Sequence, residues 1–230
     1  MGGGLVEAGP SSTRTMSPDR ALPAPDSEWR RQVLALDETY HPKVRQLAVN
    51  MEWWIRACIR NNRDNGYWFV VAGPEGVGKT HCARRAHQYI LERQIDAYHR
   101  GWLTDSSLHS PALLRWDLVA DGDDADFRYT MDNEVAPARA VIIDDVGAET
   151  DRYRSAVPMA RLKAVLDMAD DCNKWLLVTT NIARPDWPER FGIRVAGRLG
   201  SEGAKQRTRY LTLFGVPSYR AHGSTPSTPS

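Results

Sequence analysis

The chain has 230 residues, of which 42% are hydrophobic and 26% are charged, and its formal net charge is +1. These values are typical of a globular α/β domain with a substantial core and exclude a polycation, so any nucleic-acid contact has to use a local basic patch. No apolar run is long enough to span a membrane and no signal peptide opens the chain, so we expect a cytoplasmic protein without membrane contact.

The two ends of the chain are rich in Gly, Pro and Ser. Residues 1–27 and 221–230 show no periodic apolar pattern, and we interpret them as disordered tails. Residues 28–66 are expected to form a helical N-terminal linker, because apolar residues from Val44 to Cys58 recur at spacings of three and four. The three cysteines are far apart in the sequence and are interpreted as reduced thiols.

A strand, a glycine loop and a helix follow in that order. Residues 67–72 ("YWFVVA") form a short apolar run, as expected of a buried parallel strand. The loop "GPEGVGKT" comes next, and the apolar spacing from Cys82 to Ile90 predicts a helix after it. Between 99 and 135 the pattern is weak: residues 110–118 are interpreted as a short helix and residues 121–127 as an acidic loop.

The second half of the chain alternates strands and helices. Strands are predicted at 139–144, 175–181 and 209–214, and helices at 159–169 and 188–199. We expect the strand at 139–144 to lie beside the strand at 67–72. This alternation predicts a parallel sheet covered by helices on both faces.

The loop at 73–80 fits the pattern G-x-x-x-x-G-K-[ST]. Its glycines let backbone N–H groups surround a phosphate at a helix N-terminus, where the helix dipole also favours an anion. Lys79 should reach the β- and γ-phosphates, and the Thr80 hydroxyl should bind Mg²⁺. The residues expected to contact the nucleotide are Gly73, Pro74, Glu75, Gly76, Val77, Gly78, Lys79, Thr80 and His81.

Polar side chains follow the other two buried strands. Asp144 and Asp145 end the strand at 139–144; the first is expected to hold Mg²⁺ and the second to polarise an attacking water. Asn181 ends the next strand, where it would lie between the carboxylates and the γ-phosphate and position that water. An ordinary strand end and a turn-forming Asn are the alternative interpretations.

Arginines recur every four residues on the predicted helix at 188–199. Arg190, Arg194 and Arg198 would therefore share one face. A solvated basic stripe is the simpler interpretation, and we prefer it for Arg190. For Arg194 and Arg198 the alternative is an arginine that reaches the nucleotide of a neighbouring subunit and neutralises transition-state charge.

Together, "GPEGVGKT", "VIIDDVGAE", "LLVTTNI" and "GIRVAGRL…YLTLFGVPSYR" resemble the AAA+ ATPases of the DnaC/IstB type. The resemblance covers about residues 43–220. It implies a P-loop ATPase domain over 67–220 with a parallel five-stranded sheet and no C-terminal helical lid. It also implies that Asp144 and Asp145 form the Walker B pair, that Asn181 is sensor 1, and that Arg198, with Arg194 beside it, is an arginine finger acting in trans.

The resemblance further implies ATP and Mg²⁺ as cofactors and self-association into a ring or spiral on single-stranded DNA. A loader-like ATPase in DNA replication, with the hexameric replicative helicase as partner, is the expected function. Two alternatives remain open: a transposition helper of the IstB type, and a nucleotide-gated adaptor that hydrolyses slowly because residue 145 is Asp, where Glu is more common. A small-molecule kinase is disfavoured, because no acceptor motif is recognisable.

Overall fold

The computed structural model describes residues 41–59, 66–101, 109–147, 156–200 and 208–218, so the predicted tails at 1–27 and 221–230 lie outside the described residues. In chain order the elements are α2 (Pro42–Ile59), β1 (Trp68–Ala72), α3 (Lys79–His99), β2 (Ala112–Arg115), α4 (Trp116–Asp121), α5 (Asp124–Thr130), the π-helix η2 (Met131–Val135), β3 (Ala140–Val146), α6 (Ala156–Asp171), β4 (Trp175–Thr180), the 3₁₀-helix η3 (Arg184–Asp186), α7 (Trp187–Gly200) and β5 (Thr208–Thr212).

The five strands form one parallel sheet in the order β2-β3-β4-β1-β5. This confirms the predicted parallel five-stranded sheet flanked by helices. The expected neighbourhood of β1 and β3 is wrong, because β4 lies between them: Leu177 is the register partner of both Phe69 and Ile142. The order of strands depends on which crossover connections pack best, and the strand sequences alone do not encode it.

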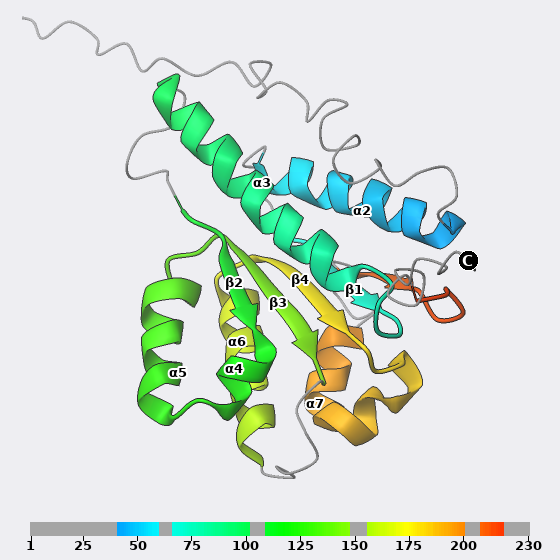
Figure 1. The fold of residues 1–230 in the computed structure, drawn as a ribbon. Coiled ribbons are helices and arrows are strands. Elements are labelled where there is room, and N and C mark those ends of the chain that lie inside the picture. Colours follow the sequence, from blue (N-terminus) through cyan, green and yellow to red (C-terminus); the bar gives the residue numbers. More distant parts are fainter. Residues whose placement is uncertain (1–40, 60–65, 102–108, 148–155, 201–207, 219–230) are drawn as a thin grey trace, which may run out of the picture.

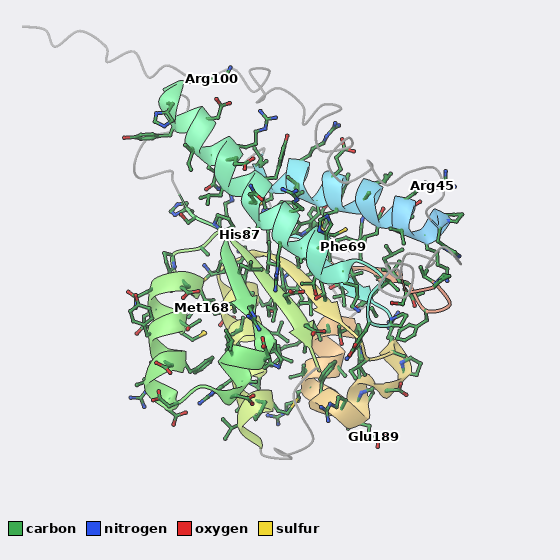
Figure 2. All side chains as sticks on the ribbon, viewed as in Figure 1. Arg45, Phe69, His87, Arg100, Met168 and Glu189 are labelled. Carbon is green, nitrogen blue, oxygen red and sulfur yellow. The ribbon has the colours of Figure 1, made fainter. Side chains whose placement is uncertain are left out.

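Helices cover both faces of the sheet (Figure 1). Helices α2 and α3 lie on one face, and α4 to α7 lie on the other. Because successive side chains of a strand point to opposite faces, Phe69 belongs to the α2–α3 core and Val70 to the other core. Side chains fill the space on both sides, with Phe69 and Met168 in the two opposite clusters (Figure 2).

Helix α2 packs as part of this core. Its Trp54 is fully buried, lies edge-on against Trp175 at a ring-centroid distance of 6.4 Å, and donates from Nε1 to the Tyr67 carbonyl at 3.1 Å. The predicted periodic stripe of α2 therefore faces the sheet. None of the helices in the described ranges is both long and apolar enough to cross a bilayer.

Between residues 110 and 127 the secondary structure differs from the prediction. The expected helix at 110–118 is instead β2 followed by α4, and the expected acidic loop at 121–127 contains the start of α5. Asp123 caps α5, with its Oδ1 accepting the N–H of Asp126 at 2.8 Å. A four-residue strand and a seven-residue helix are too short to display a hydrophobic period, so tertiary contacts decide these elements.

One of these contacts comes from Arg161 on α6, whose side chain is buried. Its Nη1 donates to the carbonyls of Val119, Ala120 and Gly122 at 2.9, 3.2 and 2.6 Å, and its Nη2 pairs with Asp124 Oδ1 at 2.8 Å. The guanidinium therefore satisfies carbonyls at the C-terminal end of α4, which have no intrahelical partner, and joins α4 to α5.

Candidate phosphate-binding site

The glycine loop connects β1 to the N-terminus of α3. Gly76 and Gly78 have φ angles of 76° and 94°, in the region that side chains other than glycine rarely adopt, and Gly78 is the N-cap of α3. Gly73 needs to be glycine for another reason, because a Cβ there would lie 2.6 Å from the Cβ of Leu213. The loop therefore presents its backbone at the positive end of a 21-residue helix, which favours an anion.

Lys79 holds this loop in shape. Its side chain is buried, and its ammonium group donates to the carbonyl oxygens of Gly73 at 2.7 Å and of Pro74 at 2.8 Å. These two short hydrogen bonds keep the ammonium charge at the mouth of the loop, where it would attract an incoming phosphate.

A pocket of about 590 Å³ opens over the loop. Its lining contains Glu75, Gly76, Gly78, Lys79, Thr80 and His81 of the predicted set, together with Asp145, Arg84, Arg85 and Gln88. Val77 is fully buried in the core, and Gly73 and Pro74 contribute through the carbonyls that Lys79 contacts. The three residues from α3 that the motif missed follow Thr80 by four, five and eight positions, a helical spacing that places them on the same side of α3.

A β-bulge at the end of β3 places the two adjacent aspartates in different environments. Ile143 pairs with Val178 and Val146 with Thr180, so Asp144 and Asp145 together oppose the single residue Thr179. Asp145 has a φ of 66°, which is uncommon outside glycine. The bulge directs Asp145 into the pocket lining, while Asp144 stays buried with 3% of its surface exposed.

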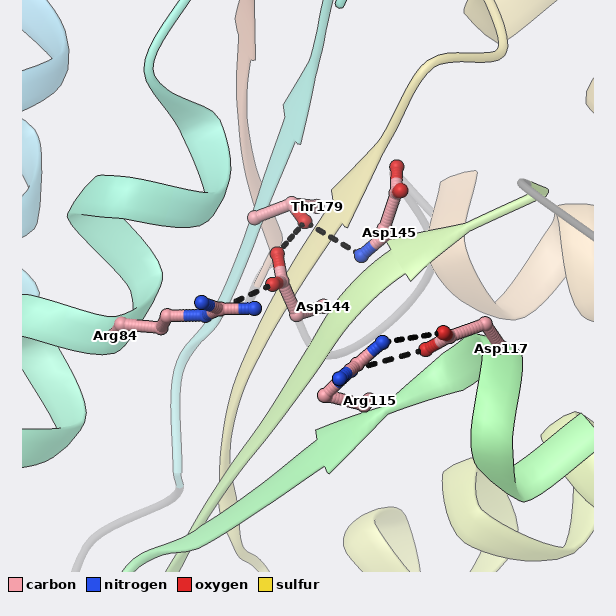
Figure 3. Close-up of polar contacts among 6 residues, drawn as sticks. All are labelled: Arg84, Arg115, Asp117, Asp144, Asp145 and Thr179. Carbon is pink, nitrogen blue, oxygen red and sulfur yellow. Dashed lines mark hydrogen bonds and ion pairs between the residues drawn. The ribbon is translucent and has the colours of Figure 1, made fainter.

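Thr179 connects the two residues of the bulge (Figure 3). Its hydroxyl donates to Oδ1 of Asp144 at 2.7 Å and accepts the backbone N–H of Asp145 at 2.8 Å. The other oxygen of Asp144, Oδ2, lies 4.0 Å from Nε of Arg84 on α3. Nearby, Arg115 on β2 pairs with Asp117 at 2.6 Å.

Asp145 lies in an environment that disfavours its charge. Burial raises the pKa of its carboxyl group, Lys79 opposes this increase, and the negative charges of Asp144 and Glu75 add to it. A carboxylate with a raised pKa beside a phosphate pocket has the properties of a proton-accepting group.

Asn181 follows β4, the strand that lies between β1 and β3. Its Oδ1 is buried and has no hydrogen-bond partner among the described residues, which is unusual for a buried amide oxygen. A Cβ added at Gly147 would lie 3.4 Å from this oxygen. The side chain lies near the end of β3, although it does not line the pocket itself.

The three arginines of α7 do not lie on one uninterrupted helix. The helix is kinked at Gly192, which has φ and ψ angles of 75° and 153°, so Arg190 precedes the kink and the other two arginines follow it. Arg198 pairs with Asp167 at 2.8 Å and faces Asp170 at 3.9 Å on α6 of the same chain. Arg194 is exposed.

These residues fit a nucleoside triphosphate with Mg²⁺. The loop supplies donors and positive charge, and the buried amide oxygen of Asn181 lacks a partner that a bound water would provide. The Thr80 hydroxyl and the Asp144 carboxylate supply the oxygen ligands that Mg²⁺ prefers, and Mg²⁺ usually completes its coordination with water and phosphate oxygens.

No family model and no curated protein sequence matches this chain. Solved structures do match its fold. The DnaC helicase loader superposes with a TM-score of 0.53 at 18% identity, over 81% of this chain and 98% of that one. DnaI superposes with a TM-score of 0.53 at 13% identity, over 82% and 92%. A protein described as a primosome component of Streptococcus pyogenes serotype M3 gives 0.52 at 17% identity, over 80% and 87%. The chain therefore has the same fold as the DnaC helicase loader and DnaI.

Proposed function

We propose that the protein binds ATP with Mg²⁺ in this pocket and hydrolyses it, acting in DNA replication as a helicase-loader-like ATPase that oligomerises on single-stranded DNA. One observation carries the proposal: the same pocket of about 590 Å³ is lined by Lys79, Thr80 and Asp145. A loop that binds phosphate and a carboxylate that can orient water are the two halves of a phosphoryl-transfer site.

Each residue has a distinct role in this proposal. Lys79 binds the β- and γ-phosphates. Thr80 and Asp144 hold Mg²⁺, which supplies neutralisation of phosphate charge when it is bound. Asp145 orients the attacking water and accepts its proton, and Asn181 positions that water from the end of β4.

The proposed partners are the hexameric replicative helicase, single-stranded DNA and further copies of this chain, in the cytoplasm. The structures that match this fold include a helicase loader and a primosome component, which supports a role in replication. The net charge of +1 means that DNA would contact a local surface and not the whole molecule.

An arginine acting on the nucleotide of a neighbouring copy completes the proposed site. Both Arg194 and Arg198 remain candidates. Arg198 would have to leave Asp167, with which it forms an ion pair at 2.8 Å, whereas Arg194 is exposed. In the finger role Arg198 would therefore have to give up an ion pair, whereas Arg194 forms no ion pair with another residue in the described part of the chain.

A nucleotide-gated adaptor with slow hydrolysis is the second candidate, and Asp145 favours it. Asp is one methylene shorter than Glu, and its position depends on a bulge with a φ of 66°. A site whose carboxylate is shorter, and is held by a specific backbone distortion, can still bind nucleotide through its phosphate loop while orienting the attacking water less well.

Steady-state ATP turnover with and without single-stranded DNA tests these candidates. The loader-like function predicts that DNA raises turnover and that sedimentation detects larger assemblies with ATP and DNA together. Asp145→Asn should retain ATP binding, and its turnover should be lower than that of the wild type. Turnover that stays at the background of the Asp145→Asn variant under all these conditions contradicts hydrolysis and leaves the adaptor.

A further inference from the structure

Arg84 is a positively charged residue that lines the pocket but lies outside the phosphate-loop motif. It lies on α3 one turn after Thr80 and lines the pocket together with Lys79 and Asp145. Its side chain is 56% exposed, so it is able to move without breaking core packing. Figure 3 shows it extending from α3 toward the end of β3.

The group that Arg84 faces is a buried carboxylate. The Asp144 side chain is 4% exposed; Thr179 donates to its Oδ1, and its Oδ2 lies 4.0 Å from Arg84 Nε. A buried carboxylate is costly unless a cation or hydrogen bonds compensate its charge. Arg84 therefore supplies positive charge on the side of Asp144 that Thr179 does not contact.

Arg84 could exchange its contact with Asp144 for a contact with a phosphate group. At 4.0 Å the two atoms are beyond hydrogen-bond distance, so the attraction is electrostatic, and the exposed side of the guanidinium is screened by solvent. A guanidinium also matches phosphate oxygens in a planar, two-pronged geometry. Arg84 is thus placed between a carboxylate and the space where the phosphates of a nucleotide would lie.

We propose that Arg84 shares its charge between Asp144 and the bound triphosphate, and that it takes the place of the metal ion when none is present, so that the site holds ATP without Mg²⁺. This inference rests on the proposed function, since it requires that the pocket binds ATP. With metal bound at Asp144, Arg84 contributes less to the ATP affinity, because the carboxylate and the phosphates already have a cation between them.

Fluorescent N-methylanthraniloyl-ATP, titrated into the full chain with EDTA or with saturating Mg²⁺, tests this. Arg84→Gln should weaken binding about tenfold or more in EDTA and less than about threefold with Mg²⁺, since the guanidinium contributes most when no metal ion compensates the phosphate charge. Arg84→Lys, which keeps the charge, should retain most of the EDTA affinity. Arg100→Gln is the control: Arg100 lies at the far end of the same helix (Figure 2), is 53% exposed, and pairs with Asp96.

The outcomes separate this inference from the proposed function. Three outcomes would overturn the role of Arg84 while leaving ATP binding intact. In the first, Arg84→Gln loses the same affinity with and without Mg²⁺; in the second, it loses no affinity in EDTA. In the third, the wild-type chain binds the analogue only with Mg²⁺. A wild-type chain that binds in neither condition would overturn the proposed function itself.

Discussion

Thr179 on β4 holds Asp144 on β3 through a hydroxyl hydrogen bond of 2.7 Å, and the same hydroxyl accepts the N–H of Asp145 at 2.8 Å. A single buried side chain therefore orients one proposed metal ligand and fixes the backbone that aims the proposed water-orienting carboxylate.

Thr179→Val should slow ATP hydrolysis about tenfold or more while changing ATP affinity less than about threefold, because it leaves Asp144 and the Asp145 N–H without their shared partner. Thr179→Ser should restore most of the rate, since it keeps the hydroxyl. Thr180→Val is the matched control: Thr180 is equally buried, but its hydroxyl donates to the Val146 carbonyl instead. If both valine variants lose the same rate, the effect is general destabilisation and not positioning.

The raised pKa of Asp145 makes stability depend on pH in a definite direction. The folded state binds this proton more tightly than the unfolded state, so the carboxylate destabilises the fold above its folded pKa, and this penalty disappears as pH falls through that pKa. Without nucleotide, Asp145→Asn should therefore raise Tm at pH 7 to 8, and the gain should shrink toward pH 4. Thermal melts of the variant, beside the exposed Asp121→Asn, check this; a gain that grows at acid pH contradicts it.

The arginine in trans is tested by mixing inactive subunits. Arg194→Ala or Arg198→Ala should each be mixed with Lys79→Ala, and the turnover compared with each variant alone. The variant that lacks the finger should regain part of the wild-type turnover in the mixture, because some sites then combine an intact loop with an intact arginine. If an arginine variant alone hydrolyses ATP normally when assembled, that arginine is not the finger.

The packing of α2 onto the sheet predicts a large loss of stability at Trp54. Trp54→Ala should lower the free energy of unfolding by about 3 to 5 kcal/mol, because it removes a fully buried aromatic side chain and its hydrogen bond to Tyr67. Val49→Ala on the exposed side of the same helix should change it by less than about 0.5 kcal/mol. Urea unfolding measures both; a loss at Trp54 as small as that at Val49 would mean that α2 is not part of the cooperative core.

Sequence patterns predicted most of the sheet because buried parallel strands are continuous apolar runs. The strands at 68–72, 140–146 and 175–180 match such runs, whereas the edge strand at 208–212 (TRYLT) mixes polar and apolar residues and is only partly buried. The phosphate loop needs glycine at positions with positive φ. The strand β2 was missed because it has four residues, too few to show a pattern.

The carboxylate site was predictable in part. The pair at 144–145 is visible in the sequence, but the bulge that separates their roles depends on the register between β3 and β4, which is a tertiary property. Thr179 carries no motif of its own, since its role follows from being opposite that bulge. Arg84 was recoverable in principle, because a residue four positions after Thr80 lies one turn along the same helix.

ATP affinity of the wild-type chain and of Lys79→Ala, measured with the fluorescent analogue at saturating Mg²⁺, tests the central claim most directly. Lys79 supplies the buried ammonium group at the mouth of the loop, held by the carbonyls of Gly73 and Pro74. The account predicts binding by the wild type and a loss of about a hundredfold or more in the variant, as expected when a charged contact to phosphate is removed from a buried site. Equal affinity of the two proteins would contradict it.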